Sequence, residues 1–321
     1  MAKKLLKIVD TKNKTIKDGF KEFYLYCRVK NLSPKSLDYY EYAYFRFAKV
    51  YNEKMLVKDI TKREIDLYIL ALKDENVGEI SINTFLRGIR VIINYWISLD
   101  YLEKFKIDLI KTTKPIKDTY TPQEIQKLLK KPNLKSCNYA EYRDWVIINM
   151  LLSSGMRATT LCNLKIKDID LDNMCMLYTT TKGRRQQIVP ISTTLLKILD
   201  EYIKIRLSQT SGNTDIWLFV SAFGAKLNSD SLNHTLRNYN RNRGIMRTGV
   251  HKWRHTFSKI YIQSKGSPFM LQKILQHKDL RMTREYVNLF DSDLQKDFNE
   301  FNPLEIMSKE NNKRVNYLKL R

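Results

Sequence analysis

The sequence predicts a mainly α-helical protein of two domains that carries one small β-hairpin or sheet. Apolar residues recur at steps of three and four over most of the chain, which is the helical period. One segment, "MCMLYTTTKGRRQQIVPIS", alternates instead, as strands do. The length of 321 residues agrees with two domains, because one domain usually takes about 100 to 200 residues.

The first domain is predicted over residues 15–105, after an N-terminal tail of residues 1–14. Its four helices are "IKDGFKEFYLYCRVKN", "SPKSLDYYEYAYFRFAKVY", "TKREIDLYILALKDE" and "SINTFLRGIRVIINYWISLDYL". Ser33 can cap the second helix, and Pro34 suits its first position, where no N–H is needed. An aromatic stripe on that helix is predicted to lie in the core rather than to stack on nucleic-acid bases. It consists of Tyr40, Tyr44, Phe47 and Tyr51.

Residues 106–120 are predicted to form an exposed basic linker, because they are rich in lysine and show little amphipathic order. The second domain is predicted over 121–290, and a capping box of Thr121 and Glu124 opens its first helix. An apolar helix, "YRDWVIINMLLSSGMR", and a short one, "ATTLCNLKIKDID", follow. Two strands joined at 182–185 come next, and further helices are predicted as far as residue 301.

The charge balance predicts a polyanionic partner. Lys and Arg number 57 against 34 Asp and Glu, a net charge of +23, which favours nucleic acid first and an anionic membrane surface second. A highly charged surface without such a partner is the alternative. The chain lacks an apolar run of roughly 18 residues, and its start, "MAKKLLKIVDTKNK", lacks the apolar stretch of a secretory signal. We therefore expect a cytoplasmic protein that does not bind membranes.

No metal site is predicted. The cysteines show neither a CxxC pair nor the spacing of zinc ligands, so reduced thiols are expected. They are Cys27, Cys137, Cys162 and Cys175. His251 and His255 have the i, i+4 spacing of a zinc-binding helix, but the glutamate between them is missing. Arg254 stands there instead, and a cation does not suit an arginine neighbour.

The stretch "GVHKWRHTF" gathers cationic and titratable side chains within little more than one helical turn. On a helix that begins near Val250, His251, Arg254 and His255 share one face. An apolar set on another face is expected to anchor the helix and to leave these three side chains pointing elsewhere. It consists of Trp253, Phe257, Ile260 and Tyr261. A solvated basic face is the alternative interpretation.

Four motifs in a fixed order carry a resemblance. They are "SSGMRATTLCNLKIKDI" with Arg157, "TTTKGRRQQIVPI" with Lys182, "VHKWRHTF" with His251 and Arg254, and "LQHKDLRMTREYV" with His277 and Tyr286. In this order, and with 277 − 254 = 23 positions between the second arginine and His277, the chain closely resembles the tyrosine recombinases, the integrase family of site-specific DNA recombinases. One departure is Thr160, where many members carry an acidic residue that supports the site.

The resemblance implies a helical core-binding domain of the SAM-like type ahead of a mixed, mostly helical catalytic domain. Two guanidinium groups, those of Arg157 and Arg254, suit the charge that grows on a phosphate during in-line displacement. Tyr286 fits the nucleophile, which needs a base or nearby cations at neutral pH. His251 is the side chain whose charge changes closest to that pH.

Four other side chains receive roles beside these. His277 is expected to hydrogen-bond the phosphate, and Lys182 resembles the general acid that protonates the departing 5′ oxygen. His255 fits a supporting role better than a catalytic one, and so does Lys252. The 3′-phosphotyrosyl linkage stores the energy of the broken bond, so neither ATP nor a metal is needed and no cofactor is expected.

The implied partner is double-stranded DNA with specific recombination sites, bound by a homotetramer of two dimers in the nucleoid. Two rounds of strand exchange would pass through a four-way Holliday junction, and an accessory directionality factor is a further partner to consider. Candidate DNA contacts are Arg87, Arg90, Arg184 and Arg185. The C-terminal tail, 291–321, carries an apolar stripe that is expected to dock on a neighbouring protomer, with packing in cis as the alternative. It consists of Leu294, Phe298 and Phe301.

Integration and excision of a mobile element is the biological role that the resemblance favours. A type IB topoisomerase shares the same chemistry but rejoins the same strand, and it is the nearest rival. A regulator that binds DNA without cleaving it is the rival from another class. The full set of six candidate residues argues against the regulator.

Overall fold

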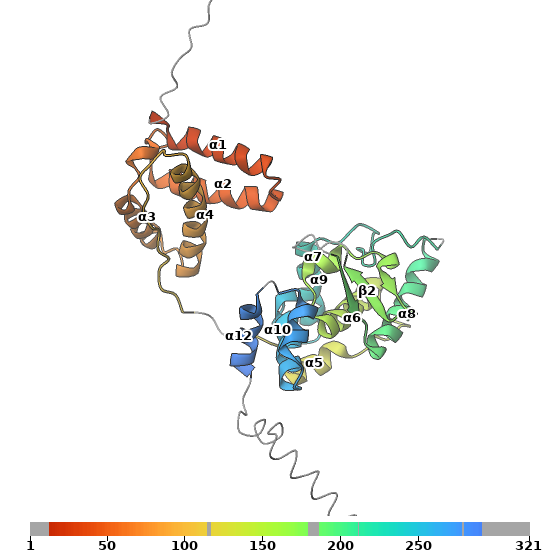
Figure 1. Cartoon of the computed structure of the whole chain (residues 1–321). Coiled ribbons are helices and arrows are strands. Elements are labelled where there is room, and N and C mark those ends of the chain that lie inside the picture. Colours follow the sequence, from red (N-terminus) through yellow and green to blue (C-terminus); the bar gives the residue numbers. More distant parts are fainter. Residues whose placement is uncertain (1–12, 114–116, 179–185, 211, 278, 291–321) are drawn as a thin grey trace, which may run out of the picture. The chain divides into compact units, whose positions relative to one another are not determined.

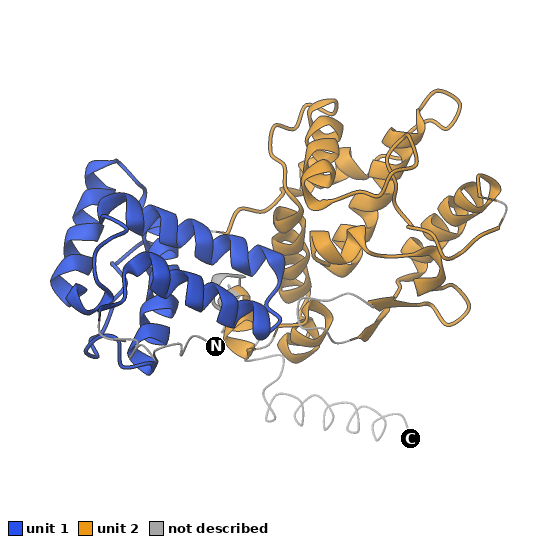
Figure 2. Ribbon diagram, turned by 90° about the horizontal axis from the view of Figure 1, so that it is seen from above, with its two compact units in different colours: residues 1–115 blue, residues 116–321 orange. Residues whose placement is uncertain are grey.

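The computed structural model describes residues 13–113, 117–178, 186–210, 212–277 and 279–290. The chain divides into two compact units, Met1–Pro115 and Ile116–Arg321 (Figure 2). Both units are built mainly from helices (Figure 1), so the predicted fold class is confirmed. Each unit has its own apolar core.

The described part of the first unit, residues 13–113, is a bundle of four helices. These are α1 (Ile16–Val29), α2 (Pro34–Val50), α3 (Lys62–Asp74) and α4 (Glu79–Ser98), with a short 3-10 helix at Val57–Asp59. The cap predicted at Ser33 is present, because its side chain accepts a hydrogen bond from the Ser36 N–H. The aromatic stripe of α2 packs in the core as predicted, and the ring of Tyr44 stacks on Phe20 with centroids 3.9 Å apart.

The exposed linker predicted over 106–120 is wrong at both ends. Ile107 is buried in the core of the first unit. The Asn83 side chain of α4 donates to the Ile110 carbonyl and accepts from the Ile110 N–H, at 2.9 and 3.0 Å. Tyr120 is buried in the second unit, where its N–H donates to Thr256 Oγ1 at 2.9 Å. These segments pack without forming a helix or a strand, so a search for helical periodicity did not detect them.

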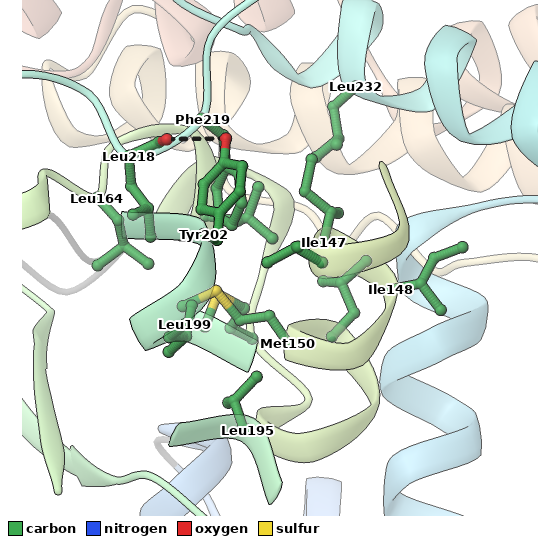
Figure 3. Packing of buried hydrophobic residues seen from close by; sticks show 14 of the residues in the cluster. Ile147, Ile148, Met150, Leu164, Leu195, Leu199, Tyr202, Leu218, Phe219 and Leu232 are labelled. Atoms are coloured by element: carbon green, nitrogen blue, oxygen red, sulfur yellow. Dashed lines mark hydrogen bonds between the residues drawn. The ribbon is translucent and has the colours of Figure 1, made fainter. Parts of the chain in front are cut away.

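The second unit surrounds a central helix, α6. Its helices are α5 (Pro122–Leu129), α6 (Tyr139–Ser154), α7 (Ala158–Cys162), α8 (Thr193–Ser208), α9 (Ser229–Arg241), α10 (Val250–Gln263), α11 (Pro268–Leu275) and α12 (Leu280–Phe290). Helix α6 is buried on most of its sides, and Ile147 and Met150 meet Leu199 and Tyr202 of α8 in the core (Figure 3). The Tyr202 hydroxyl donates to the Leu218 carbonyl at 3.2 Å.

A small antiparallel sheet lies beside these helices. Its strands, β1 (Ile169–Asp170), β2 (Cys175–Tyr178) and β3 (Gln187–Pro190), pair in the order β1-β2-β3. Met176 pairs with Val189, and Tyr178 pairs with Gln187. The two predicted strands are thus confirmed, whereas their predicted turn at 182–185 lies outside the described residues.

The short helix predicted over 158–170 is correct only for Ala158–Cys162. A 3-10 helix follows at Ile166–Asp168, where the Asp168 carboxylate accepts from the Lys165 N–H at 2.8 Å. Strand β1 comes next, and two residues are too short to show the alternation that predicts a strand.

All four cysteines lie in the described part of the chain and are free thiols, buried at Cys27 and Cys162. Within the same described ranges, no helix is both long and apolar enough to cross a membrane.

Candidate active site

A left-handed turn at Gly155 ends α6 and leads the chain to Arg157, which precedes α7. Gly155 has φ +59°, and its N–H closes the helix on the Leu151 carbonyl. A Cβ at this position would lie 2.5 Å from Phe257 Cδ1 and 2.8 Å from Leu275 Cδ2. Only glycine fits such a turn without strain, and it lets the end of α6 pack closely against α10 and α11.

Arg254 of α10 is buried and holds two helix ends together. The side chain is 5% exposed, and it donates from Nη1 to the Gly155 carbonyl at 2.8 Å and from Nη2 to the Leu275 carbonyl at 2.6 Å. Carbonyl groups at helix C-termini carry partial negative charge, which suits a guanidinium. Burial first, and then the charge of Arg157, lower the pKa of Arg254 to about 10. The group therefore remains charged at neutral pH.

The expectation that Arg254 points away from the core needs correction. Trp253 is fully buried as predicted, but Arg254 and Ser258 are buried too. Ile260, expected on the anchoring face, is exposed. The reason is the pair of carbonyl acceptors described above, which lets a cation lie inside the unit with its hydrogen bonds satisfied.

Tyr286 of α12 is surrounded by histidine and cationic side chains. The side chain is 3% exposed, and its hydroxyl oxygen lies 2.9 Å from His255 Nδ1. The His277 ring stacks on the phenol ring with centroids 6.2 Å apart and planes 4° apart. Lys117 Nζ lies 3.8 Å from the phenol centroid, in cation–π contact. Burial lowers the pKa of Arg157, and Tyr286 opposes that effect through its charge.

His277 is buried in the turn between α11 and α12, after Gln276 in the left-handed conformation. Its Nδ1 lies 2.9 Å from Thr283 Oγ1, and Thr283 is fully buried in α12. The turn and the threonine together fix the ring beside the phenol.

His255 is held in its neutral form. Burial is the largest cause that lowers its pKa to about 4, and the positive charges of Lys117, His251 and Arg254 add to it. The supporting role predicted for His255 understates its position, because the structure places the imidazole directly on the Tyr286 hydroxyl. Helical spacing could not show which residue of another helix meets His255.

The structure thus brings four predicted residues to one place: Arg157, Arg254, His277 and Tyr286. His251 is exposed at the start of α10. Lys182, Arg184 and Arg185 lie outside the described residues. In the first unit, Arg87 of α4 is exposed and Arg90 is half-buried. Thr160 is buried in α7.

Sequence reasoning missed three contributors. Gly155 had a detectable signal, since a glycine directly after an apolar helical run is typical of a helix end. Lys117 was one lysine among several in the segment taken for a linker. Thr283 gave no signal, because its role depends on the fold of the turn before it.

Among the described residues, no group of three or more His, Cys, Asp or Glu side chains could hold a metal ion. What the described cluster offers instead is a phenol beside a neutral imidazole, with guanidinium and ammonium groups around it. Such an arrangement suits attack by the phenol oxygen on an anionic phosphate.

Comparison with known proteins agrees with this geometry. Residues 119–293, more than half of the chain, match the phage integrase family, and residues 20–102 match the phage integrase N-terminal SAM-like domain. The chain belongs to the phage integrase family. The resemblance to the tyrosine recombinases is thereby confirmed, and the protein is an enzyme of that recombinase class.

Similar members of the family are known from sequence and from solved structures. A tyrosine recombinase XerD from Staphylococcus haemolyticus is 27% identical over 76% of this chain and 83% of its own length. The Tn1549 transposon integrase bound to transposon right end DNA shares 18% identity and a TM-score of 0.67, over 85% of this chain and 94% of that one. A lambda integrase tetramer bound to a Holliday junction gives 15% identity and a TM-score of 0.68, over 88% and 80%. At these identities the two solved structures show the fold alone.

Proposed function

We propose that the protein cleaves and rejoins DNA at specific sites, through a 3′-phosphotyrosyl intermediate on Tyr286 and a Holliday junction. The observation that carries the proposal is the position of the Tyr286 hydroxyl, which lies on a neutral histidine within a group of buried or half-buried cations. A tyrosine whose only role was to pack in the core would not need cations around its ring.

Arg157 and Arg254 stabilise the phosphate in this proposal. A guanidinium has five N–H donors, and the bonds from Arg254 to two carbonyls fix the side chain while other donors can face phosphate oxygens. This fixed positive charge is in place before the reaction, so it costs little reorganisation at the transition state. In this proposal His277, whose ring is held by Thr283, hydrogen-bonds the same phosphate.

The bond changes in the proposed step balance. The Tyr286 oxygen forms a bond to phosphorus and gives up its proton, while the bond from phosphorus to the 5′ oxygen breaks. The departing oxygen takes a proton from Lys182, the general acid that the family resemblance suggests. A 5′ hydroxyl from a partner duplex then reverses these steps and releases the tyrosine.

We propose double-stranded DNA as the partner and a tetramer of two dimers as the assembly. The net charge of +23 supports DNA binding. The lambda integrase tetramer on a Holliday junction offers an example of such an assembly with this fold. For the biological role we propose integration and excision of a mobile element, a role that DNA flanking the gene would test through inverted repeats or element ends.

Tyr286→Phe tests the nucleophile. The variant should bind DNA as the wild type does and form no covalent protein–DNA adduct on denaturing gels. Adduct that persists in this variant would remove Tyr286 from the mechanism. The topoisomerase alternative is tested with supercoiled plasmid that lacks a target site, where efficient relaxation would count against recombination.

A further inference from the structure

We propose that His255 accepts the phenolic proton of Tyr286 when the phenol oxygen attacks the phosphate. This role rests on the proposed function, and it makes His255 a catalytic residue in addition to the six expected from the family motifs. The geometric basis is the 2.9 Å distance between His255 Nδ1 and the Tyr286 hydroxyl oxygen. That distance is normal for a hydrogen bond in which a proton can be transferred.

The charge state of His255 allows it to accept a hydrogen bond from the phenol. A neutral imidazole has one acceptor nitrogen, whereas a protonated imidazole has none. The lowered pKa keeps His255 neutral throughout the physiological range. The proposal places the imidazole proton on Nε2, so that Nδ1 accepts a hydrogen bond from the Tyr286 hydroxyl.

The place of His255 in the fold fixes this geometry. His255 lies within the 14-residue helix α10. It directly follows Arg254, whose side chain is held by the Gly155 and Leu275 carbonyls. Tyr286 lies on α12, which packs along α10 (Figure 1). Both side chains therefore come from helices that contact each other, so little conformational entropy is lost in bringing them together.

Lys117 complements His255 in this scheme. Its ammonium group stabilises the phenolate that remains when the proton has moved, because it lies 3.8 Å from the ring centroid. Asp118, the next residue, fixes the backbone beside Lys117, because it forms ion pairs with Lys252 and Arg247. Tyr120, whose N–H bonds Thr256 of α10, adds a further anchor.

Among the residues that the structure describes, the charged and titratable groups found around the pair come from several segments. They are Lys117 from the segment before α5, Arg157 before α7, His251 and Arg254 on α10, and His277 before α12. All are cations or histidines. They stabilise the phenolate during the step. Because they also disfavour a charged imidazole, His255 gives the accepted proton up to solvent once the bond to phosphorus has formed.

The test uses a labelled duplex nicked next to the scissile phosphate, selected from duplexes tiled across the DNA flanking the gene. The nick lets the short cleaved end diffuse away, so the covalent adduct accumulates in a single turnover. His255→Asn is the informative variant, because its amide oxygen can accept the hydroxyl hydrogen bond but cannot take the proton. We expect adduct formation to slow on the order of 10²-fold or more, with unchanged DNA affinity.

His234→Asn is the matched control, since His234 is exposed on α9. It should form adduct at the wild-type rate. A second variant, His255→Gly, should regain part of its rate when imidazole is added, which a purely structural role would not allow. Wild-type speed in His255→Asn would overturn the inference.

A measurement on the wild type keeps the inference testable if the variants do not fold. If His255 is the acceptor, the adduct rate should stay level as the pH falls from 8 to roughly 5.5, because the acceptor titrates near pH 4. A decline centred near about 6.5, the ordinary histidine value, would assign the step to another histidine and overturn the inference. Loss of adduct in Tyr286→Phe is a separate result, so the proposed function can stand when the role of His255 fails.

Discussion

His255 of α10 and Tyr286 of α12 stand 31 positions apart in the sequence, and a 2.9 Å hydrogen bond joins His255 Nδ1 to the Tyr286 hydroxyl. The bond ties the position of the phenol to a helix that also carries Arg254. The protonation of His255, the packing of α10 and the proposed binding of phosphate by Arg254 are therefore linked at one point of the fold. Each can be tested by itself.

The free energy of unfolding should decrease as the pH is lowered from about 6.5 to about 4, because of the titration of His255. The folded pKa of His255 is about 4, whereas an unfolded histidine titrates near about 6.5. Between these values the unfolded state binds more protons, so the free energy of unfolding rises with pH. The contribution is present above the unfolded pKa and is lost as pH falls toward the folded pKa.

Urea unfolding of the wild type at pH 7 and at pH 5 measures this loss. His255→Asn should lose less stability over the same interval, because it lacks the buried imidazole. The carboxylates titrate alike in both proteins and do not contribute to the difference. His234→Asn should follow the wild type. Equal losses in wild type and His255→Asn would contradict the assignment.

Gly155→Ala should destabilise the second unit and slow cleavage. The left-handed backbone alone costs an alanine roughly 1–2 kcal/mol, and the Cβ would also meet Phe257 at 2.5 Å. Gly224→Ala is the control for the backbone term, since Gly224 has φ +81° with no atom within 4 Å of an added Cβ. We expect the Gly155 variant to lose more stability in urea than the Gly224 variant, and only the former to form adduct slowly.

Arg254→Lys should impair both folding and cleavage although it keeps the charge. A lysine cannot donate to the Gly155 and Leu275 carbonyls with the geometry of a planar guanidinium. Leaving a buried acceptor unpaired costs about 1–3 kcal/mol, and loss of one preorganised donor should slow adduct formation by about 10² to 10³. The exposed Arg237, changed to Lys, serves as control. An unaltered urea midpoint in Arg254→Lys would argue against the bridging role.

DNA affinity should fall linearly with salt on logarithmic axes, with a slope set by the number of phosphates contacted. Arg87→Ala, which removes an exposed cation of α4, should reduce that slope by about 1 if Arg87 contacts a phosphate. Arg28→Ala, at the exposed end of α1, should leave it unchanged. Fluorescence anisotropy of a labelled duplex at several salt concentrations gives both slopes, and equal slopes for Arg87→Ala and the wild type would exclude the contact.

Local features of the fold were predictable from the sequence, and contacts between distant segments were not. The capping box of Thr121 and Glu124 needs only residues three positions apart, and it is present. The hydrogen bonds of Asn83 to the Ile110 backbone join residues that are 27 positions apart, and no periodic pattern in the sequence predicts them.

The site follows the same rule. The types and order of Arg157, Arg254 and Tyr286 suggested phosphate chemistry, but the burial of Arg254 depends on carbonyls at the ends of two other helices. The contact between His255 and Tyr286 depends on how α10 packs against α12. Pairing of this kind is decided by the whole core, so helical spacing could not predict that His255 contacts the phenol.

The scarcity of histidine has a spectroscopic consequence. The chain holds four histidines; His251 and His255 lie on α10, His277 lies beside Tyr286, and His234 lies on α9. An imidazole NMR spectrum of the whole protein would therefore contain four sets of resonances, with His234 as an internal reference. The protonation of the group that touches the phenol could then be followed directly while DNA is added.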